Sequence, residues 1–191
     1  MKIILASSSP YRRELLQRLM LPFEVEIPEI DETPRPGEGP EALVERLAVE
    51  KARAVAQRRA AGLVIGSDQV AVHDGCIVGK PKDHEHAVAQ LRQASGRRIM
   101  LYTGLALVNA GSGRVQSEVV PFGVVFRNLS EAQIERYLDK ERPYGCAGSV
   151  KSEGLGIALL ERFEGEDPNT LIGLPLIRLI RMLENEGVTV I

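Results

Sequence analysis

The residue best placed to do chemistry in this sequence is Asp68, which follows a short apolar run at residues 63–66. In open α/β sheets, ligands bind beyond the carboxyl ends of the strands, so an aspartate at such an end is a candidate metal ligand or general base. An aspartate in an ordinary turn is the alternative. Asp31 and Glu32 add two carboxylates within a proline-rich loop, and their oxygens suit a divalent cation that bridges phosphate groups.

Three cations stand at positions where a charge calls for a partner. Arg12 falls in the first turn of a predicted helix, where it opposes the helix dipole unless it faces an anion. Lys51 interrupts an alanine-rich helix face, and Lys80 lies in a rigid turn between Gly79 and Pro81. Arg12 and Lys51 each have a structural alternative, because a solvated arginine, or a lysine stem along an apolar face, needs no ligand. With the loop carboxylates, these cations fit metal-assisted attack of water on a phosphoanhydride.

A polar loop just before Arg12 offers a place for a phosphate group. Ser9 suits the N-cap of the predicted helix, and Pro10 suits its first turn. Ser7, Ser8 and Ser9 present hydroxyl and backbone N–H groups beside the arginine, as anion-binding helix N-termini do. We therefore expect Ser7 and Ser9 to bind the phosphates of a substrate.

Motifs of other enzyme classes are incomplete in this chain. The segment at residues 75–80 is one residue short of a phosphate-binding P-loop, and residues 154–156 lack the third glycine of a dinucleotide fingerprint. His84 and His86 are two positions apart, so they do not share one face of a helix. There is no G-x-S-x-G motif. The sequence therefore disfavours covalent catalysis and catalysis by histidine.

Composition narrows the class of protein. The chain has 191 residues, of which 44% are hydrophobic and 26% charged, so it can build a globular core without disulfides or a structural metal. A net charge of −2 disfavours a nucleic-acid partner, and no apolar run approaches the ~18 residues of a membrane span. The two cysteines cannot form a disulfide framework, and the apolar start is too short for a signal peptide. We expect a cytoplasmic protein.

The elements that must position these residues alternate between strand and helix. The predicted strands cover residues 3–6, 23–27, 63–66, 70–72, 76–78, 99–108, 115–126, 155–160 and 188–191, and the predicted helices cover 11–20, 41–61, 83–95, 130–140 and 174–186. This alternation predicts an α/β fold, with a mixed, twisted sheet and flanking helices, in a single domain over residues 1–191.

The sequence resembles the Maf family of nucleoside triphosphate pyrophosphatases. The matching segments, which span essentially the whole chain in order, are residues 5–16, 46–48, 51–52, 66–70, 79–81, 102–104 and 173–175. The resemblance implies an α/β fold with two lobes around a central cleft, similar to inosine triphosphate pyrophosphatases. It also implies cleavage of a small-molecule nucleoside triphosphate between its α- and β-phosphates, a divalent cation (Mg or Mn) and, commonly, a homodimer.

The resemblance also assigns roles to individual residues. It implies that Asp68 is the general base and a metal ligand, and that Glu32 assists it at the metal. Arg12, Lys51 and Lys80 fall where the family contacts the triphosphate. These roles agree with the chemistry that the residue types suggest by themselves.

Three further residues concern the base of the nucleotide. Tyr11, Gln69 and Glu153 look like the branch of the family that hydrolyses 7-methyl-GTP, rather than the branch that acts on dTTP and UTP. Methylation at N7 gives guanine a positive charge, which the electron-rich face of Tyr11 attracts. Glu153 can accept from the N1 and N2 donors of guanine, although without the resemblance a solvated loop glutamate is the simpler reading. Gln69 would pack beside the base.

We therefore expect hydrolysis of 7-methyl-GTP to 7-methyl-GMP and pyrophosphate, which would remove modified nucleotides from the nucleotide pool. Two alternatives stay open at this stage. One is a pyrophosphatase for dTTP, UTP or another modified nucleotide, and the other is a nucleotide-binding regulator of cell division or septum formation. Turnover separates these two classes, because a regulator binds the triphosphate without hydrolysing it.

Overall fold

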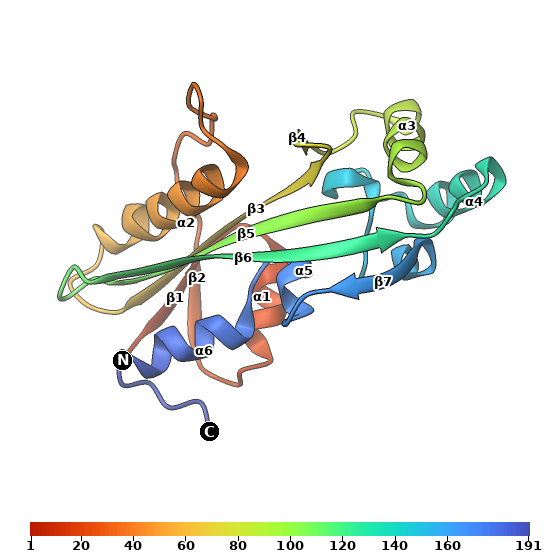
Figure 1. Cartoon of the computed structure of the whole chain (residues 1–191). Coiled ribbons are helices and arrows are strands. Elements are labelled where there is room, and N and C mark those ends of the chain that lie inside the picture. The colour runs from red at the N-terminus through yellow and green to blue at the C-terminus, as the bar shows by residue number, and fades with distance from the viewer. The chain divides into compact units, whose positions relative to one another are not determined.

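The computed structural model describes residues 1–191, which form two compact units. The first unit contains residues 1–69, 102–120 and 167–191, and the second contains residues 70–101 and 121–166. The chain passes from one unit to the other four times: within the three long strands β3 (Leu63–His73), β5 (Arg98–Asn109) and β6 (Val115–Phe126) (Figure 1), and between residues 166 and 167. The single domain and the cleft between two lobes stay predictions.

The sheet of the first unit is built around a buried apolar strand. All four residues of β1 (Ile3–Ala6) are buried, and the strand pairs in parallel with β2 (Phe23–Glu26) on one side and with β3 on the other. The strand order in this unit is β2-β1-β3-β5-β6. Ala6, the last residue of β1, lies opposite Gly66 of β3. Ser67 and Asp68 of β3 therefore come just beyond the end of β1.

Alternate residues of these strands face opposite helical layers, as the pleat requires. One layer contains α1 (Pro10–Gln17) and α6 (Leu176–Glu184), which share a hydrophobic cluster with Ile3 and Leu5. The other layer is α2 (Pro40–Ala56), which packs on Ile4, Ala6 and Val64 (Figure 1). The sheet of the first unit is therefore covered on both faces, which explains its continuous apolar strands.

Helix α2 lies directly on the backbone of β3 and β5. A Cβ atom at Gly66 would lie 2.1 Å from the carbonyl oxygen of Ala48, and one at Gly104 would lie 2.1 Å from the carbonyl oxygen of Val44. Only glycine therefore allows the approach. The approach brings the face of α2 that carries Lys51 against the sheet and buries this lysine.

The substitution Gly104→Ala is expected to destabilise the protein by at least about 1–3 kcal/mol, the range for an overpacked core. The reason is that the new methyl group meets helix backbone, which cannot move aside as a flexible side chain can. Thermal unfolding measures the effect. Gly145→Ala is the control, because Gly145 has an ordinary φ and nothing lies within 4 Å of its Cβ position. Equal stability of Gly104→Ala and wild type would contradict the close approach.

The second unit extends the same strands with antiparallel partners. β4 (Cys76–Val78) pairs antiparallel with β3, and β7 (Leu160–Glu164) pairs antiparallel with β6, which makes the seven-stranded sheet mixed. The helices of this unit are α3 (His84–Ala94) and α4 (Glu131–Glu141), which pack together, and the 3₁₀ helices η1 (Ala147–Ser149) and η2 (Leu155–Leu159). Its core includes Leu91, Phe122, Ile134 and Leu138.

The predicted α/β class, with a mixed sheet and flanking helices, is confirmed. Two predicted strands are wrong: residues 155–159 form η2, with the strand starting at Leu160, and residues 188–191 form no strand. Apolar runs this short do not distinguish a strand from a helix. In η2, Gly156 donates its N–H to the carbonyl oxygen of Lys151, at a place too tight for a Cβ atom. None of the helices combines the length and apolar character needed to cross a membrane.

Candidate active site

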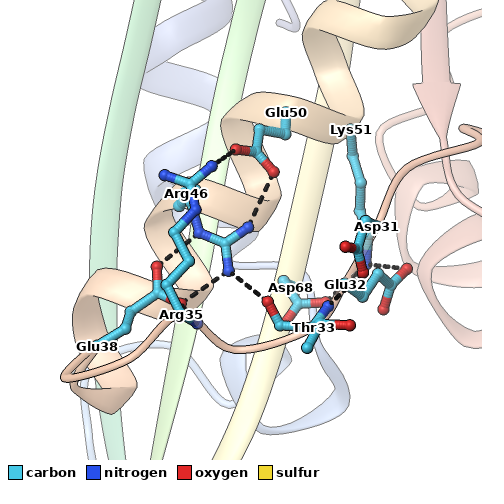
Figure 2. Close-up of polar contacts among 9 residues, drawn as sticks. All are labelled: Asp31, Glu32, Thr33, Arg35, Glu38, Arg46, Glu50, Lys51 and Asp68. Carbon is cyan, nitrogen blue, oxygen red and sulfur yellow. Dashed lines mark hydrogen bonds and ion pairs between the residues drawn. The ribbon is translucent and has the colours of Figure 1, made fainter.

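Lys51 lies at the centre of a group of charges in the first unit. Its Nζ atom lies 2.7 Å from Oδ1 of Asp68 and 2.9 Å from Oε1 of Glu32, so one ammonium group bridges two carboxylates (Figure 2). Lys51 is only 6% exposed, because α2 carries it between Ala48 and Ala52 on the face that packs on the sheet. A charge buried this far needs ionic partners, and the two carboxylates supply them.

Asp68 lies within β3 rather than just past its end, because the strand continues to His73 and pairs with β4. The parallel neighbour β1 has nevertheless ended at Ala6, opposite Gly66. Asp68 therefore follows the part of β3 that pairs in parallel with β1, but the predicted end of the strand at residue 66 is wrong, because residues 63–73 form one continuous strand. Its side chain is 13% exposed, so the carboxylate is shielded but not sealed from a ligand.

The guanidinium group of Arg12 belongs to the same group of charges. Its Nε donates to the carbonyl oxygen of Gly173 at 2.9 Å, and the buried hydroxyl of Ser67 donates to that same oxygen at 2.9 Å. Burial lowers the pKa of Arg12, while the negative charges of Asp68 and Glu32 oppose this shift. Arg12 thus lies within electrostatic range of the two carboxylates that Lys51 bridges.

The serines before α1 hold the start of the helix. The Ser9 hydroxyl accepts from the backbone N–H of Arg12 at 3.3 Å, which confirms the predicted N-cap, and the Ser7 hydroxyl accepts from the N–H of Ser9 at 3.1 Å. Tyr11, in the first turn, is 36% exposed, so its ring is accessible. Phosphate binding by Ser7 and Ser9 and stacking by Tyr11 stay predictions.

A clasp of ion pairs holds the loop that carries Glu32 against α2. The Arg46 guanidinium donates to both carboxylate oxygens of Glu38, to Glu50 at 2.9 Å and to the Thr33 carbonyl oxygen at 3.2 Å, and Arg35 reaches Glu50 at 2.9 Å (Figure 2). The hydrogen bonds from Arg46 lower the pKa of Glu38 to about 2. The Glu38 carboxylate therefore stays charged throughout the neutral and mildly acidic range.

The substitution Arg46→Ala is expected to loosen this loop and to reduce catalytic efficiency by roughly tenfold to a hundredfold, because misplacing a positioned group is costly even at a distance. The rate of hydrogen exchange at the backbone amides of residues 31–38 should also increase in this variant. Arg92→Ala is the matched control, since Arg92 makes a similar bidentate pair with Glu131 on the exposed surface of the second unit. Unchanged exchange in the loop of Arg46→Ala would contradict the clasp.

A network of polar side chains next to Asp68 could not be predicted from the sequence. The Gln69 Nε2 atom donates to the Thr103 hydroxyl at 2.8 Å and to the Thr170 carbonyl oxygen at 2.6 Å, and the Thr103 hydroxyl donates to that carbonyl at 3.1 Å. These bonds tie α5 (Asn169–Ile172), a helix that the sequence pattern does not predict, to β3. Contact between Gln69 and a base stays a prediction.

Lys80 and Glu153 belong to the second unit, and both are exposed. Burial raises the pKa of the Cys146 thiol, the Glu153 carboxylate raises it further and Lys80 lowers it, so both side chains lie within electrostatic reach of one thiol. Glu141 holds the loop that carries Glu153, because it accepts the backbone N–H of Leu155 at 2.6 Å. That Lys80 and Glu153 share a site with Asp68 stays a prediction.

The carboxylates of the first unit fit a divalent cation only in part. No three His, Cys, Asp or Glu side chains come together as a metal site, and Asp31 accepts from the backbone N–H of Thr33 at 2.9 Å instead of joining the others. Asp68 and Glu32 do converge on one positive charge, the Lys51 ammonium. Mg²⁺ is commonly held by one or two carboxylates together with substrate phosphates and water. The donor set therefore suits a cation held jointly by protein and substrate.

Fold and site together define a class: a mixed α/β protein whose buried lysine, partly buried arginine and paired carboxylates suit a phosphorylated ligand. The chain belongs to the family of Maf-like proteins, whose family model matches residues 2–186. It is 59% identical over 189 residues to a 7-methyl-GTP pyrophosphatase of Nitrosococcus oceani, and the alignment covers 99% of this chain and 95% of that protein.

Two solved structures are similar to parts of this chain. A HAM1 protein from Coxiella burnetii is 17% identical with a TM-score of 0.48, over 68% of this chain and 74% of that one. The Ham1 protein of Staphylococcus aureus is 14% identical with a TM-score of 0.44, over 67% of this chain and 73% of that one. Family membership rests on the sequence match.

Proposed function

We propose that this protein is a nucleoside triphosphate pyrophosphatase that hydrolyses 7-methyl-GTP to 7-methyl-GMP and pyrophosphate. The observation that carries the proposal is the 59% identity, over 99% of the chain, to a protein that bears this name. Membership of the Maf-like family supports it, as does the grouping of Lys51 and Arg12 with two carboxylates.

The cations of the first unit are the groups that receive the triphosphate. Arg12 donates through Nε to Gly173, which fixes the plane of the guanidinium group and leaves its Nη atoms for phosphate oxygens. Lys51 offers an ammonium group within reach of the same place. Lys80 is the third phosphate-binding cation in this proposal, and the hydroxyls of Ser7 and Ser9 line the phosphate cradle.

Asp68 accepts a proton from the attacking water while the water oxygen forms a bond to the α-phosphorus. The bond from that phosphorus to the bridging oxygen then breaks, and pyrophosphate leaves. A bound Mg²⁺ or Mn²⁺, held by Asp68 and Glu32, would supply positive charge that polarises the phosphoryl oxygens. Lys51 and Arg12 offset the negative charge that builds on the phosphates.

Three residues recognise the base in this proposal. Tyr11 stacks on the methylated ring, and Glu153 accepts hydrogen bonds from the N1 and N2 donors of the guanine. Thymine and uracil lack this pair of donors. Gln69 adds a contact beside the base, next to Asp68. A site built around polar partners discriminates against ligands that leave those partners unpaired.

The substitution Glu153→Gln should lower the efficiency with 7-methyl-GTP and relax discrimination against dTTP and UTP, because it removes the charge and keeps the shape. Tyr11→Ala should instead reduce the preference for 7-methyl-GTP over GTP, by about 2- to 30-fold, which corresponds to a cation–π contribution of about 0.5–2 kcal/mol. The values of kcat/KM for the four nucleotides give these ratios. Glu161→Gln, an exposed glutamate of β7, is the control. Unchanged ratios in Glu153→Gln would contradict its role.

The proposed activity is tested by a panel of nucleoside triphosphates with detection of pyrophosphate, in the presence of Mg²⁺ or Mn²⁺. The highest kcat/KM is expected for 7-methyl-GTP. A preference for dTTP or UTP would show that the proposed substrate is wrong, although the proposed class, a nucleoside triphosphate pyrophosphatase, would still hold. Binding of triphosphates without any turnover would instead favour a nucleotide-binding regulator of cell division.

The same proposal includes the cellular setting. We propose a cytoplasmic enzyme that removes modified nucleotides, acts as a homodimer and binds no nucleic acid. Light scattering of the purified protein tests the homodimer, and a retardation assay with duplex DNA and single-stranded RNA tests the last point.

A further inference from the structure

Lys51 makes ion pairs with both carboxylates that the proposed function assigns to the divalent cation. Its Nζ atom lies 2.7 Å from Asp68 and 2.9 Å from Glu32. Because Lys51 is 6% exposed and lies on the buried face of α2, the ammonium group stays at the site. Each carboxylate therefore already has a cationic partner before any ligand binds.

The formal charges around this point cancel. Arg12 is near enough for the charges of the same two carboxylates to oppose the lowering of its pKa, so two positive and two negative groups lie in this region. A dication that enters alone would meet two like charges near its ligands, and such repulsion is strong in a partly buried site. A triphosphate brings several negative charges and so makes the site favourable for a dication.

We propose that Lys51 is a resident counter-ion, which keeps the divalent cation from binding tightly until the triphosphate arrives. This inference rests on the proposed function, which brings the cation and the triphosphate to the site. Glu32 is the partner that exchanges, because its side chain is 57% exposed on a loop, whereas that of Asp68 is 13% exposed within a strand. Lys51 turns from Glu32 to a phosphate oxygen, and the carboxylate oxygens become available to the cation.

The consequence is linked binding of nucleotide and metal ion. If the triphosphate raises the affinity for the cation by some factor, the cation must raise the affinity for the triphosphate by the same factor. Lys51 then has two successive roles at one place: it neutralises the carboxylates in the free protein and contacts phosphate in the complex. A residue that only bound phosphate would have no effect on metal binding to the free protein.

Mn²⁺ binding to the nucleotide-free protein tests the proposal, with electron paramagnetic resonance used to count free Mn²⁺. Lys51→Met should bind Mn²⁺ at least about tenfold more tightly than wild type, because one nearby positive charge is gone. Methionine is an unbranched, uncharged side chain that suits the buried helix face where Lys51 lies. Lys2→Met is the matched control, since Lys2 pairs with Glu24 at 3.0 Å on the exposed surface. The double variant Lys51→Met with Glu32→Gln should lose the gain.

A second measurement uses the unmodified protein. Wild type should bind Mn²⁺ at least about tenfold more tightly when the non-hydrolysable α,β-methylene analogue of GTP is present, after Mn²⁺ held by the analogue itself is subtracted. Equal Mn²⁺ affinity of Lys51→Met and wild type would overturn the proposal, as would equal affinity of wild type with and without the analogue. Neither measurement depends on turnover, so failure of 7-methyl-GTP hydrolysis would overturn the proposed function alone.

Discussion

The substitution Asp68→Asn is expected to lower turnover of 7-methyl-GTP by about 10²–10⁴-fold, the usual loss when a general base is removed, and by more if metal binding weakens as well. Asparagine keeps the shape of the side chain, and Lys51 keeps Glu32 as an ionic partner at 2.9 Å. The fold and the binding of nucleotide should therefore survive. Single-turnover rates and binding of the α,β-methylene analogue of GTP give the two readouts.

Asp139→Asn is the matched control for this experiment, because Asp139 is an exposed aspartate on α4. It should hydrolyse the nucleotide at the rate of wild type. Near-normal hydrolysis by Asp68→Asn would remove Asp68 from the role of general base. Loss of analogue binding together with turnover would show that Asp68 holds the substrate or the fold instead.

The substitution Arg12→Ala is expected to lower kcat/KM for every nucleoside triphosphate by about 30- to 5000-fold, which corresponds to about 2–5 kcal/mol for a truncated buried charge partner. The losses should be similar for all bases, because phosphates carry no base identity. The site is also left with one cation against two carboxylates, which adds to repulsion of the triphosphate. Steady-state kinetics with 7-methyl-GTP, GTP and UTP measures the effect.

Arg13→Ala tests whether this loss comes from the position rather than from net charge. Arg13 is the next residue of α1 and is exposed, so its removal changes the protein charge by the same amount. We expect a small effect on kcat/KM. A change of base preference in Arg12→Ala, with the overall efficiency kept, would contradict the assignment to the phosphates.

Local patterns in the sequence predict the parts of the site that lie on single elements. The run before Asp68 predicts a strand, and the position of Lys51 between two alanines predicts a lysine on an apolar helix face. The structure confirms both, and it adds that the lysine is bridged to Asp68 and Glu32. Ser9 as an N-cap is predictable for the same reason, since capping depends on only a few neighbouring residues.

Contacts between distant segments are the part that sequence reasoning cannot supply. Gln69 meets the carbonyl oxygen of Thr170 across 101 positions, and nothing in the spacing of residues links the two. Arg46 and Glu50 lie four apart on one helix and can be paired in advance, but the bond from Arg46 to Glu38 depends on how the loop returns to α2. The strand predicted at residues 188–191 is wrong for another reason, because a short apolar run is compatible with several conformations.

The anchor of Arg12 also has a consequence for the newly synthesised chain. Arg12 donates to Gly173, 161 positions later, and the cluster around β1 includes Leu174 and Leu179 of the same late segment. A ribosome must therefore synthesise the chain at least as far as Gly173 before this guanidinium group is held in place. Contacts of such high sequence separation slow folding, because the chain loses the entropy of closing a long loop before the contact energy is gained. Translation products that end before Gly173 should accordingly lack the anchored form of Arg12, however much of the preceding chain they contain.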